Sequence, residues 1–272
     1  MSFTADYHMH THLSPDAGTE STCTSMAEAA IRAGLSEICV TEHCECTGFL
    51  TPTENLGLTY DRPLYLAELA AARERFGDRI GLPAGVEIGQ AIQNRAYADE
   101  ILANDPYDFV IGSVHAMRGR GDVCFMTFQS ADECMEVVHQ YLDELIETAE
   151  TTEFDVMGHV DYPLRYMRNR FDVSYHSVEE KFRHLLHLLA IKGRGIEINT
   201  KVLRGDSRVD TQQDYLLRTF REEGGEILTV GSDAHYPRDV AAGVAESYAL
   251  ARACGFDRIA TFRKHQPTFH SL

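Results

Sequence analysis

The chain has 272 residues, 44% of them hydrophobic, and carries 42 acidic against 25 basic residues, for a formal net charge of −17. This length and composition predict a globular protein with a sizeable core and exclude a disordered chain. The acidic excess argues against a nucleic-acid backbone as a partner. The sequence also has no run of the roughly 20 apolar residues that a membrane span needs.

Cysteine usage and the N-terminus bear on location. The seven cysteines are an odd number, and the N-terminus shows neither the basic region nor the apolar run of a secretory leader. Secreted proteins usually pair their cysteines. We therefore expect free thiols in a reducing, cytoplasmic environment.

Short apolar strands and helices alternate along the whole sequence. After an opening strand that carries His8 and His10, the predicted strands cover residues 36–43, 80–89, 107–115, 154–161, 195–200, 226–235 and 258–262. The predicted helices cover residues 22–34, 63–76, 95–103, 131–148, 176–191, 212–223 and 240–254. This alternation predicts a single α/β domain over residues 1–272, with crossover helices between parallel strands.

Polar side chains with ligand chemistry lie near the carboxyl ends of nearly every predicted strand. They are His8, His10, Asp16, Glu42, His43, Glu87, His115, His159, Asp161, Asp233 and His235. A β/α barrel assembles its site from many strand ends, whereas a doubly wound sheet uses a few ends at one switch point. With seven or eight strands, we expect a closed or nearly closed barrel.

The opening stretch has a metal-chelating pattern. His8 and His10 project from one face of a strand, and Asp16 follows a Ser-Pro turn that can bring an oxygen ligand back to them. Any one strand-end residue can have a structural role, such as a helix cap at Glu42 or Asp161. Together, imidazoles and carboxylates converging on one rim favour bound cations, and mixed nitrogen and oxygen ligands suit Zn, Fe or Mn.

The ligands exceed what a single ion needs, because a catalytic zinc site uses about three protein ligands. More than one ion is therefore indicated. Neighbouring ions about 3.5–4 Å apart are a usual device for hydrolysing phosphate esters, since they bind phosphoryl oxygens and generate hydroxide near neutral pH.

The ordered motifs resemble those of the PHP (polymerase and histidinol phosphatase) superfamily. They are His8-Met9-His10, Thr41-Glu42-His43, Gly85-Val86-Glu87, Ser113-Val114-His115, Gly158-His159 and Ser232-Asp233-Ala234-His235. Within that superfamily the chain resembles the PHP-type histidinol-phosphate phosphatases of histidine biosynthesis. The stretches that carry this second resemblance are residues 6–12, 158–166 and 195–200.

The resemblance implies a distorted (β/α)7 TIM-like barrel that holds three divalent transition-metal ions. By resemblance, the first ion would be held by His8, His10, Glu87 and Asp233; the second by Glu87 as a bridge with His115 and His159; and the third by Asp16, His43 and His235. All these positions carry competent ligands.

Arginines near the strand ends are candidates for binding phosphate, because guanidinium offers a planar fork to its oxygens. Arg165 follows the strand of His159, and Arg204 follows residues 195–200; the resemblance also favours these two. Arg118 is a weaker candidate. The loop 119–122 departs from the pattern of these phosphatases.

The resemblance and the ligand set together predict hydrolysis of a phosphate monoester, L-histidinol phosphate, to L-histidinol and phosphate. A metal-bound hydroxide would attack in line, while arginines and cations stabilise charge on the equatorial oxygens. The leaving alkoxide would take its proton from a water or from a protonated residue such as His235 or Asp161. The sequence leaves these three sources open.

Other interpretations also stay open. A second enzyme hypothesis keeps the fold and metals but replaces the substrate by another small phosphate ester or a nucleic-acid end, since fold does not determine function. The third hypothesis is a noncatalytic metal-binding protein, in which the coordination of each ion is saturated. Cys44 and Cys46 follow His43 and invite a structural-zinc interpretation, although no partner pair is evident. The sequence does not determine the oligomeric state.

Overall fold

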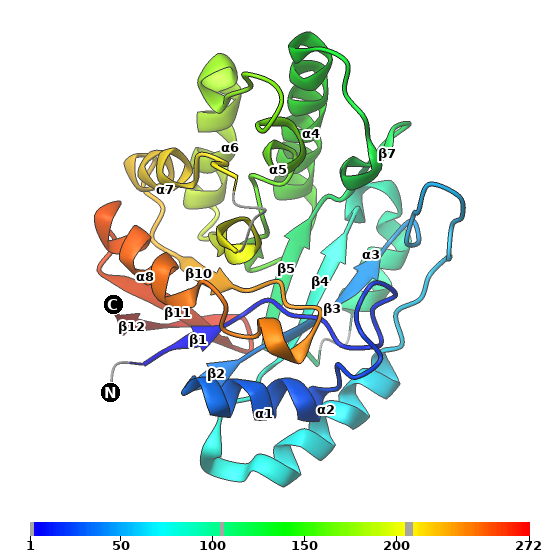
Figure 1. Ribbon diagram of the computed structural model, residues 1–272, viewed down its shortest axis with the longest axis vertical. Helices are drawn as coiled ribbons and strands as arrows, with labels where there is room; N and C mark the ends of the chain where they lie inside the picture. The colour runs from blue at the N-terminus through cyan, green and yellow to red at the C-terminus, as the bar shows by residue number, and fades with distance from the viewer. Residues whose placement is uncertain (1–2, 104–105, 205–208) are drawn as a thin grey trace.

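Six parallel strands form the centre of the computed structural model, which describes residues 3–103, 106–204 and 209–272. In spatial order they are β10 (Leu228–Gly231), β9 (Gly195–Asn199), β8 (Val156–Met157), β5 (Phe109–Ser113), β4 (Ala84–Gly89) and β3 (Val40–Glu45). A further parallel pair consists of β1 (Ala5–Asp6) and β2 (Glu37–Ile38). Figure 1 shows the strands at the centre, with helices on both sides.

The opening segment, residues 5–10, closes the sheet into a ring. On one side, Tyr7 N donates to the carbonyl oxygen of Val230 in β10 at 2.8 Å. On the other side, Thr41 N in β3 donates to Met9 O at 2.8 Å. Seven parallel segments therefore surround the core, which confirms the expected distorted (β/α)7 TIM-like barrel. The ring is irregular here because β1 and β2 pair over only two residues each.

The crossover helices agree closely with the predicted ones. They are α1 (Cys23–Ala33), α2 (Arg62–Phe76), α3 (Arg95–Leu102), α4 (Ala131–Thr151), α6 (Glu179–Ile191), α7 (Gln213–Glu222) and α8 (Val244–Ala253); the short helix α5 (Leu164–Met167) has no predicted counterpart. Thr22 caps α1 by accepting from Ser25 N, and Gly34 ends it at φ 77°. Helix α6 begins later than expected because Tyr175–Val178 forms a 3-10 turn. Other 3-10 turns are Gly77–Arg79, Ala91–Gln93, Val123–Phe125, Thr200–Leu203 and Pro237–Asp239.

An antiparallel hairpin of β11 (Arg258–Arg263) and β12 (Gln266–Ser271) covers the amino-terminal end of the barrel. Phe262 packs on Phe109, with ring centres 5.0 Å apart, and its N–H donates to Tyr7 Oη at 3.0 Å. Only the first of these strands was expected. The second has no clear apolar alternation, because most of its side chains are exposed.

Two small elements at the opposite end were also not expected. A hairpin of β6 (Ala116–Met117) and β7 (Gly121–Asp122) follows β5, and α5 follows β8. Elements of two to four residues are too short to show a periodic pattern. They contribute side chains to the site described below.

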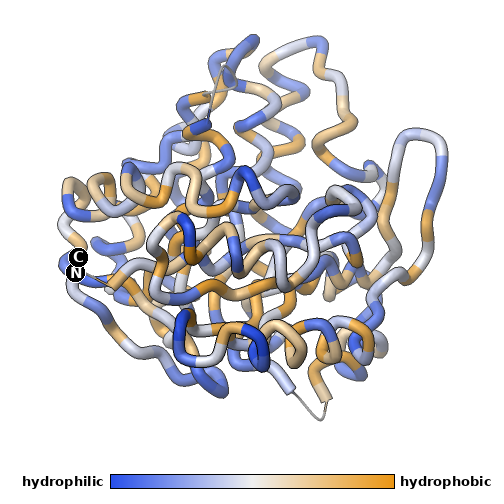
Figure 2. Tube along the Cα trace, turned by 60° about the horizontal axis from the view of Figure 1, so that its bottom comes forward, coloured by the Kyte–Doolittle hydropathy of each residue, from blue (hydrophilic) through white to orange (hydrophobic). Residues whose placement is uncertain are grey.

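The core lies inside the barrel and between the barrel and its helices. Every residue of β3, β4, β5, β9 and β10 is buried. Figure 2 shows apolar segments concentrated in the centre, and both views place the two chain ends close together. Among the described residues, no helix combines the length and apolar character needed to cross a membrane.

Candidate metal centre and active site

The carboxyl ends of the barrel strands bring all the predicted metal ligands into one cluster. These residues are His8, His10, Asp16, His43, Glu87, His115, His159, Asp233 and His235. All but Asp16 are buried. Parallel strands end at one edge of the barrel, so residues scattered along the sequence meet there.

His8 and His10 define the first donor group. Their Nε2 atoms are 3.1 Å apart, so alternate residues on the opening segment do share a face. Asp233 Oδ1 lies 3.6 Å from His10 Nε2, and Glu87 Oε2 lies 3.3 Å from His8 Nε2. Asp233 reaches the group from a left-handed backbone conformation, φ 53°, just after β10.

His115 and His159 define the second group, with Nε2 atoms 3.0 Å apart. Glu87 Oε1 lies 2.8 Å from His159 Nε2 and 3.3 Å from His115 Nε2. The two oxygens of Glu87 therefore face different donor groups. This is the arrangement that a bridging carboxylate requires.

Asp16, His43 and His235 form the third group at the rim. Asp16 Oδ2 lies 2.8 Å from His235 Nε2 and 3.7 Å from His43 Nε2, and its side chain is 35% exposed. The His43 ring stacks on His10 with centres 4.0 Å apart. The third group is thus continuous with the first.

The donor atoms fit divalent cations. Two nitrogens bound to one tetrahedral zinc ion at about 2.0–2.1 Å lie about 3.3 Å apart, close to the spacing within each histidine pair. Glu87 Oε2 is buried among imidazole nitrogens, with His43 Nδ1 2.9 Å and His8 Nε2 3.3 Å away, yet it accepts no well-directed hydrogen bond within the described part of the chain. A buried carboxylate oxygen without a well-directed donor is costly unless a cation is bound to it.

Burial, carboxylates and imidazoles shift one another's pKa values inside the cluster, and burial together with neighbouring imidazoles holds the pKa of His10 well below its ordinary value. Burial alone would lower the pKa of His8, yet Glu197 and Glu87 raise it well above the ordinary value. Burial would raise the pKa of Glu87, but the surrounding imidazoles hold it well below its usual range. Glu45 and Glu87 likewise outweigh burial and raise the pKa of His115 to about 10. The carboxylates therefore stabilise positive charge on the groups next to them, as they would on a bound cation.

Two carboxylates that sequence analysis did not select orient these imidazoles. Glu197 Oε1 lies 2.7 Å from His8 Nδ1, and Glu45 Oε1 lies 2.8 Å from His115 Nδ1. Such contacts leave the other ring nitrogen facing the cluster. Asn199 donates to Glu197 at 3.2 Å. The available signal was the spacing of Glu197 and Asn199, which lie on one face of the predicted strand 195–200.

Glu42 has a different position. It accepts from Thr11 N at 3.0 Å and from Ser14 Oγ at 2.6 Å, and so holds the loop that leads to Asp16. Cys44 and Cys46 are buried free thiols. No group with metal-binding geometry among the described residues contains a cysteine, so the structural-zinc interpretation has no ligand set.

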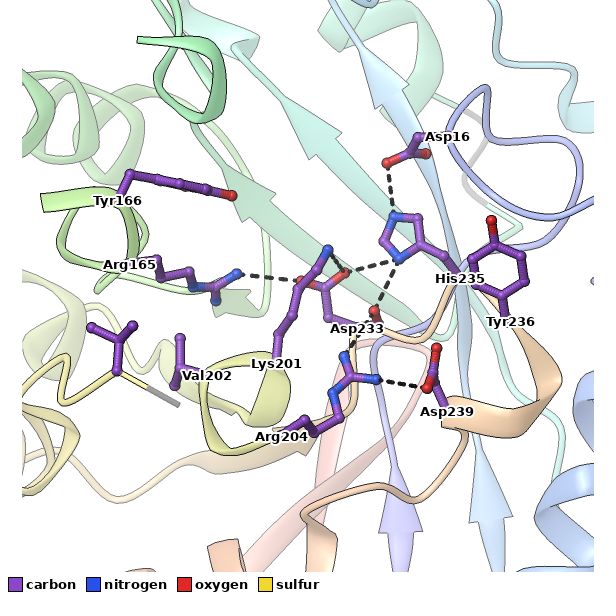
Figure 3. A pocket seen from close by; sticks show the side chains of 11 residues that line it. Asp16, Arg165, Tyr166, Lys201, Val202, Arg204, Asp233, His235, Tyr236 and Asp239 are labelled. Atoms are coloured by element: carbon purple, nitrogen blue, oxygen red, sulfur yellow. Dashed lines mark hydrogen bonds and ion pairs between the residues drawn. The ribbon is translucent and has the colours of Figure 1, made fainter. Parts of the chain in front are cut away.

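A cavity of about 560 Å³ opens beside the cluster. Its lining residues are Asp16, Arg165, Tyr166, Lys201, Val202, Arg204, Val209, Asp233, His235, Tyr236 and Asp239. Figure 3 shows Arg165, Lys201 and His235 pointing toward Asp233. Lys201 was not predicted as a site residue, although it directly follows the predicted strand 195–200.

Arg165 is buried at this cavity. Its Nη1 lies 3.5 Å from Asp233 Oδ2, while Nε and Nη2 have no hydrogen-bond partner among the described residues. Lys201 Nζ lies 3.5 Å from Asp233 Oδ1. Buried N–H donors without acceptors are suited to an anion.

The other predicted arginines are placed differently. Arg204 lines the cavity, but its Nη2 donates to Ser232 O at 2.6 Å, which uses part of the guanidinium to hold the turn before Asp233. Arg118 does not line this cavity. It pairs with Glu147 on the surface, with Nη2 and Oε1 2.7 Å apart.

The two predicted proton donors, Asp161 and His235, lie in different surroundings. Asp161 is buried behind Arg165, with its Oδ1 3.8 Å from Arg165 Nη2, and it accepts hydrogen bonds from Thr211 and Gln213. It does not line this cavity. His235 does line it, and its Nδ1 lies 3.0 Å from the Asp233 carbonyl oxygen.

A second cavity, of about 330 Å³, adjoins the first across the cluster. Both cavities are lined by Asp16, Tyr166, Lys201, Asp233 and His235. The second continues past His43, His115 and His159 to Gln90, Leu56 and Phe125. The site therefore has two compartments: a charged one, and a second one that contains His43, His115 and His159 and also reaches apolar side chains such as Leu56 and Phe125.

The barrel and its cluster of imidazoles and carboxylates define a metal-binding β/α-barrel protein. Residues 6–201 match the PHP domain, and the chain belongs to this family. It is 29% identical over 264 residues to the histidinol-phosphatase of Lactococcus lactis subsp. lactis (strain IL1403), covering 94% of this chain and 93% of the relative. It is 28% identical over 266 residues to a probable histidinol-phosphatase of Deinococcus radiodurans, covering 96% and 98%.

A solved structure has the same architecture. The chain resembles the histidinol phosphate phosphatase of Lactococcus lactis, solved in complex with zinc, L-histidinol and phosphate, with a TM-score of 0.81. The two are 26% identical, and the match covers 97% of this chain and 98% of the other.

Proposed function

We propose that this protein hydrolyses L-histidinol phosphate to L-histidinol and inorganic phosphate. The observation that carries the proposal is a buried donor cluster that lines one compartment of the site and adjoins another lined by Arg165, Lys201 and Arg204. The nearly full-length similarity to a phosphatase solved with L-histidinol and phosphate supports the same substrate. The free state of all seven cysteines agrees with the cytoplasmic location expected from the sequence.

Three divalent transition-metal ions would occupy the cluster. The residues that would hold them are His8, His10, Glu87 and Asp233; Glu87, His115 and His159; and Asp16, His43 and His235. When bound, such ions neutralise phosphoryl oxygens and supply a water-derived nucleophile near neutral pH. Zn, Fe and Mn all suit the mixed ligands, and zinc is the ion present in the solved relative.

Arg165 would bind the phosphoryl group. Its unpaired N–H groups and the ammonium of Lys201 approach the same cavity beside the cluster. In the reaction they would stabilise charge on the phosphoryl oxygens from a fixed position. Asp161, with Thr211 and Gln213 bonded to it, would hold the Arg165 guanidinium in place and would not touch the substrate.

The arrangement of His235 favours water as the proton source for the leaving oxygen. Because a carbonyl oxygen can only accept, Nδ1 of His235 would carry the proton and donate it to the Asp233 carbonyl oxygen. Its Nε2 faces Asp16 in the third donor group. Neither nitrogen of His235 is then available to donate to the substrate. His235 would act as a ligand, and a water in the cavity would protonate the alkoxide.

Phosphate release from L-histidinol phosphate tests the proposal directly. The metal-loaded protein should release phosphate, and chelator should abolish the release until metal is restored. Sugar phosphates and short oligonucleotides with terminal phosphates serve as competing substrates. Faster turnover of one of these would replace histidinol phosphate by another ester, whereas no turnover of any ester would favour the noncatalytic metal-binding alternative.

A further inference from the structure

Gln90 has a buried side chain that neither the fold nor the proposed chemistry uses. It directly follows β4, the strand that carries Glu87, and it is fully buried. Both amide atoms, Nε2 and Oε1, lack a hydrogen-bond partner among the described residues. A buried amide with neither its donors nor its acceptor used is unusual, because the lost hydration is not replaced.

The backbone at Gln90 is also unfavourable for a residue with a Cβ. Its φ of 51° and ψ of 36° lie in the left-handed region, where glycine is more easily accommodated. Its carbonyl accepts from Gln93 N at 2.9 Å, which begins a 3-10 turn. Glycine could make this turn with less strain, so the turn alone does not explain the glutamine side chain.

Gln90 is one of the residues that line the second compartment of the site. Leu56 and Phe125, which are 42% and 44% exposed, line the same cavity from two separate loops. Figure 1 shows the first of these loops, between β3 and α2, extending from the body of the molecule. Apolar walls with a few polar groups are the usual composition of a site for a small organic ligand.

The chemistry of an amide narrows the class of ligand that Gln90 could bind. A carboxylate or ammonium would select an oppositely charged group, whereas a glutamine amide offers two donors and one acceptor without net charge. Either of them can pair with one nitrogen of a neutral azole ring: the carbonyl oxygen can accept from the ring N–H, or the NH2 group can donate to the unprotonated nitrogen. Leu56 and Phe125 can cover the flat apolar parts of such a ring.

We propose that Gln90 determines specificity for the neutral nitrogen heterocycle at the end of the substrate opposite its phosphate. This inference rests on the proposed function, since it places the phosphoryl group at Arg165 and the ring in the second compartment. The amide would then hydrogen-bond the imidazole of L-histidinol phosphate. An analogue without ring nitrogens would leave the buried amide unpaired, which is a strong basis for discrimination.

The test compares L-histidinol phosphate with L-phenylalaninol phosphate, which keeps the amine, the phosphate and a flat ring but has no ring nitrogens. In Gln90→Leu and Gln90→Gly, the ratio of kcat/KM for the two substrates should fall about ten- to a hundredfold from the wild-type ratio. Gln90→Gly also relieves the backbone strain and should melt no lower than wild type. Gln90→Asn keeps an amide in a residue that tolerates this conformation, and it should retain more of the preference.

The outcomes separate the two proposals. If the wild-type holoenzyme releases no phosphate from L-histidinol phosphate, the proposed function fails and the role of Gln90 fails with it. If wild type is active but the substrate ratio in Gln90→Gly stays within about twofold of wild type, only the role of Gln90 is overturned. An equal loss for both substrates would also overturn it, because that result indicates a general effect on the neighbouring His115. Inhibition by L-histidinol, weakened in the same variants, is the matching binding measurement.

Discussion

The two ends of the barrel both contain buried charged groups, but they satisfy them in different ways. At the amino-terminal end, Glu37 accepts from Arg263 Nη1 at 3.0 Å, and Asp108 accepts from Ala84 N at 3.0 Å and from Lys264 N at 3.1 Å. At this end, N–H groups of the protein itself therefore satisfy the carboxylates as hydrogen-bond donors. The hairpin of β11 and β12 supplies several of them.

At the carboxyl-terminal end, donors and acceptors do not match within the described residues. Glu87 Oε2 has imidazole nitrogens around it but accepts no well-directed hydrogen bond, and the Nε2 atoms of His8 and His10 face each other at 3.1 Å. Two nitrogens of Arg165, Nε and Nη2, donate no hydrogen bond beside this cluster. The comparison teaches that buried charge by itself does not mark a site. Buried charged groups whose hydrogen bonds the chain leaves unmade do mark one, because a ligand can supply the missing partners.

Of four variants that test this comparison, Glu87→Gln should cause the largest loss, because it changes the carboxyl-terminal end of the barrel. It removes the charge that joins two donor groups, so metal content and kcat/KM should fall by more than about a hundredfold, since loss of an outer partner alone costs about 10–100-fold. Metal analysis and phosphate release measure both. Full metal content with normal turnover would show that Glu87 does not bridge ions.

Arg165→Met tests an arginine that has N–H donors beside the cluster without a partner in the described chain, in contrast to Arg118, whose guanidinium pairs with Glu147. It should lower kcat/KM by about a hundredfold, because fixed donors to a developing charge have effects of this size. The matched control is Arg118→Met, which should stay within about twofold of wild type, since Arg118 pairs with Glu147 on the surface. Similar losses in both variants would contradict the assignment of phosphate to Arg165.

Glu37→Gln perturbs the amino-terminal end. Arg263 and the Tyr7 hydroxyl would lose a charged acceptor, so the free energy of unfolding should fall by about 1–3 kcal/mol and the Tm by several degrees. Thermal unfolding measures this change. The folded variant should keep its metal content and turnover at low temperature; loss of metal without loss of stability would show that the two ends are not independent.

Tyr248→Phe should have the smallest effect, and it is pH-dependent. Burial raises the pKa of Tyr248 to about 12, although the Ala5 N–H bonded to its oxygen lowers it. Below about pH 10, the pKa of an unfolded tyrosine, the stabilising contribution is complete, and it is lost as pH rises toward 12. The variant should therefore lose less Tm between pH 10 and 12 than wild type. An identical alkaline decline in both proteins would contradict this pKa.

The sequence by itself determined the barrel and the residue types of the cluster. Strand and helix periodicities are local, and the carboxyl ends of parallel strands must meet at one edge, so His8, Glu87 and Asp233 could be brought together without coordinates. The limits of α1 were predictable for the same reason, because its capping residues are adjacent in sequence.

Only the tertiary structure decided which side chains contact one another. Glu45 and Glu197 lie behind the imidazoles, and Arg118 pairs with Glu147. Asp161 is buried behind Arg165, and the amide of Gln90 makes no hydrogen bond among the described residues. It also added the hairpin of β11 and β12 at the opposite end. The physical reason is that side-chain direction and hydrogen bonding depend on packing between segments far apart in sequence, which no local pattern of residues contains.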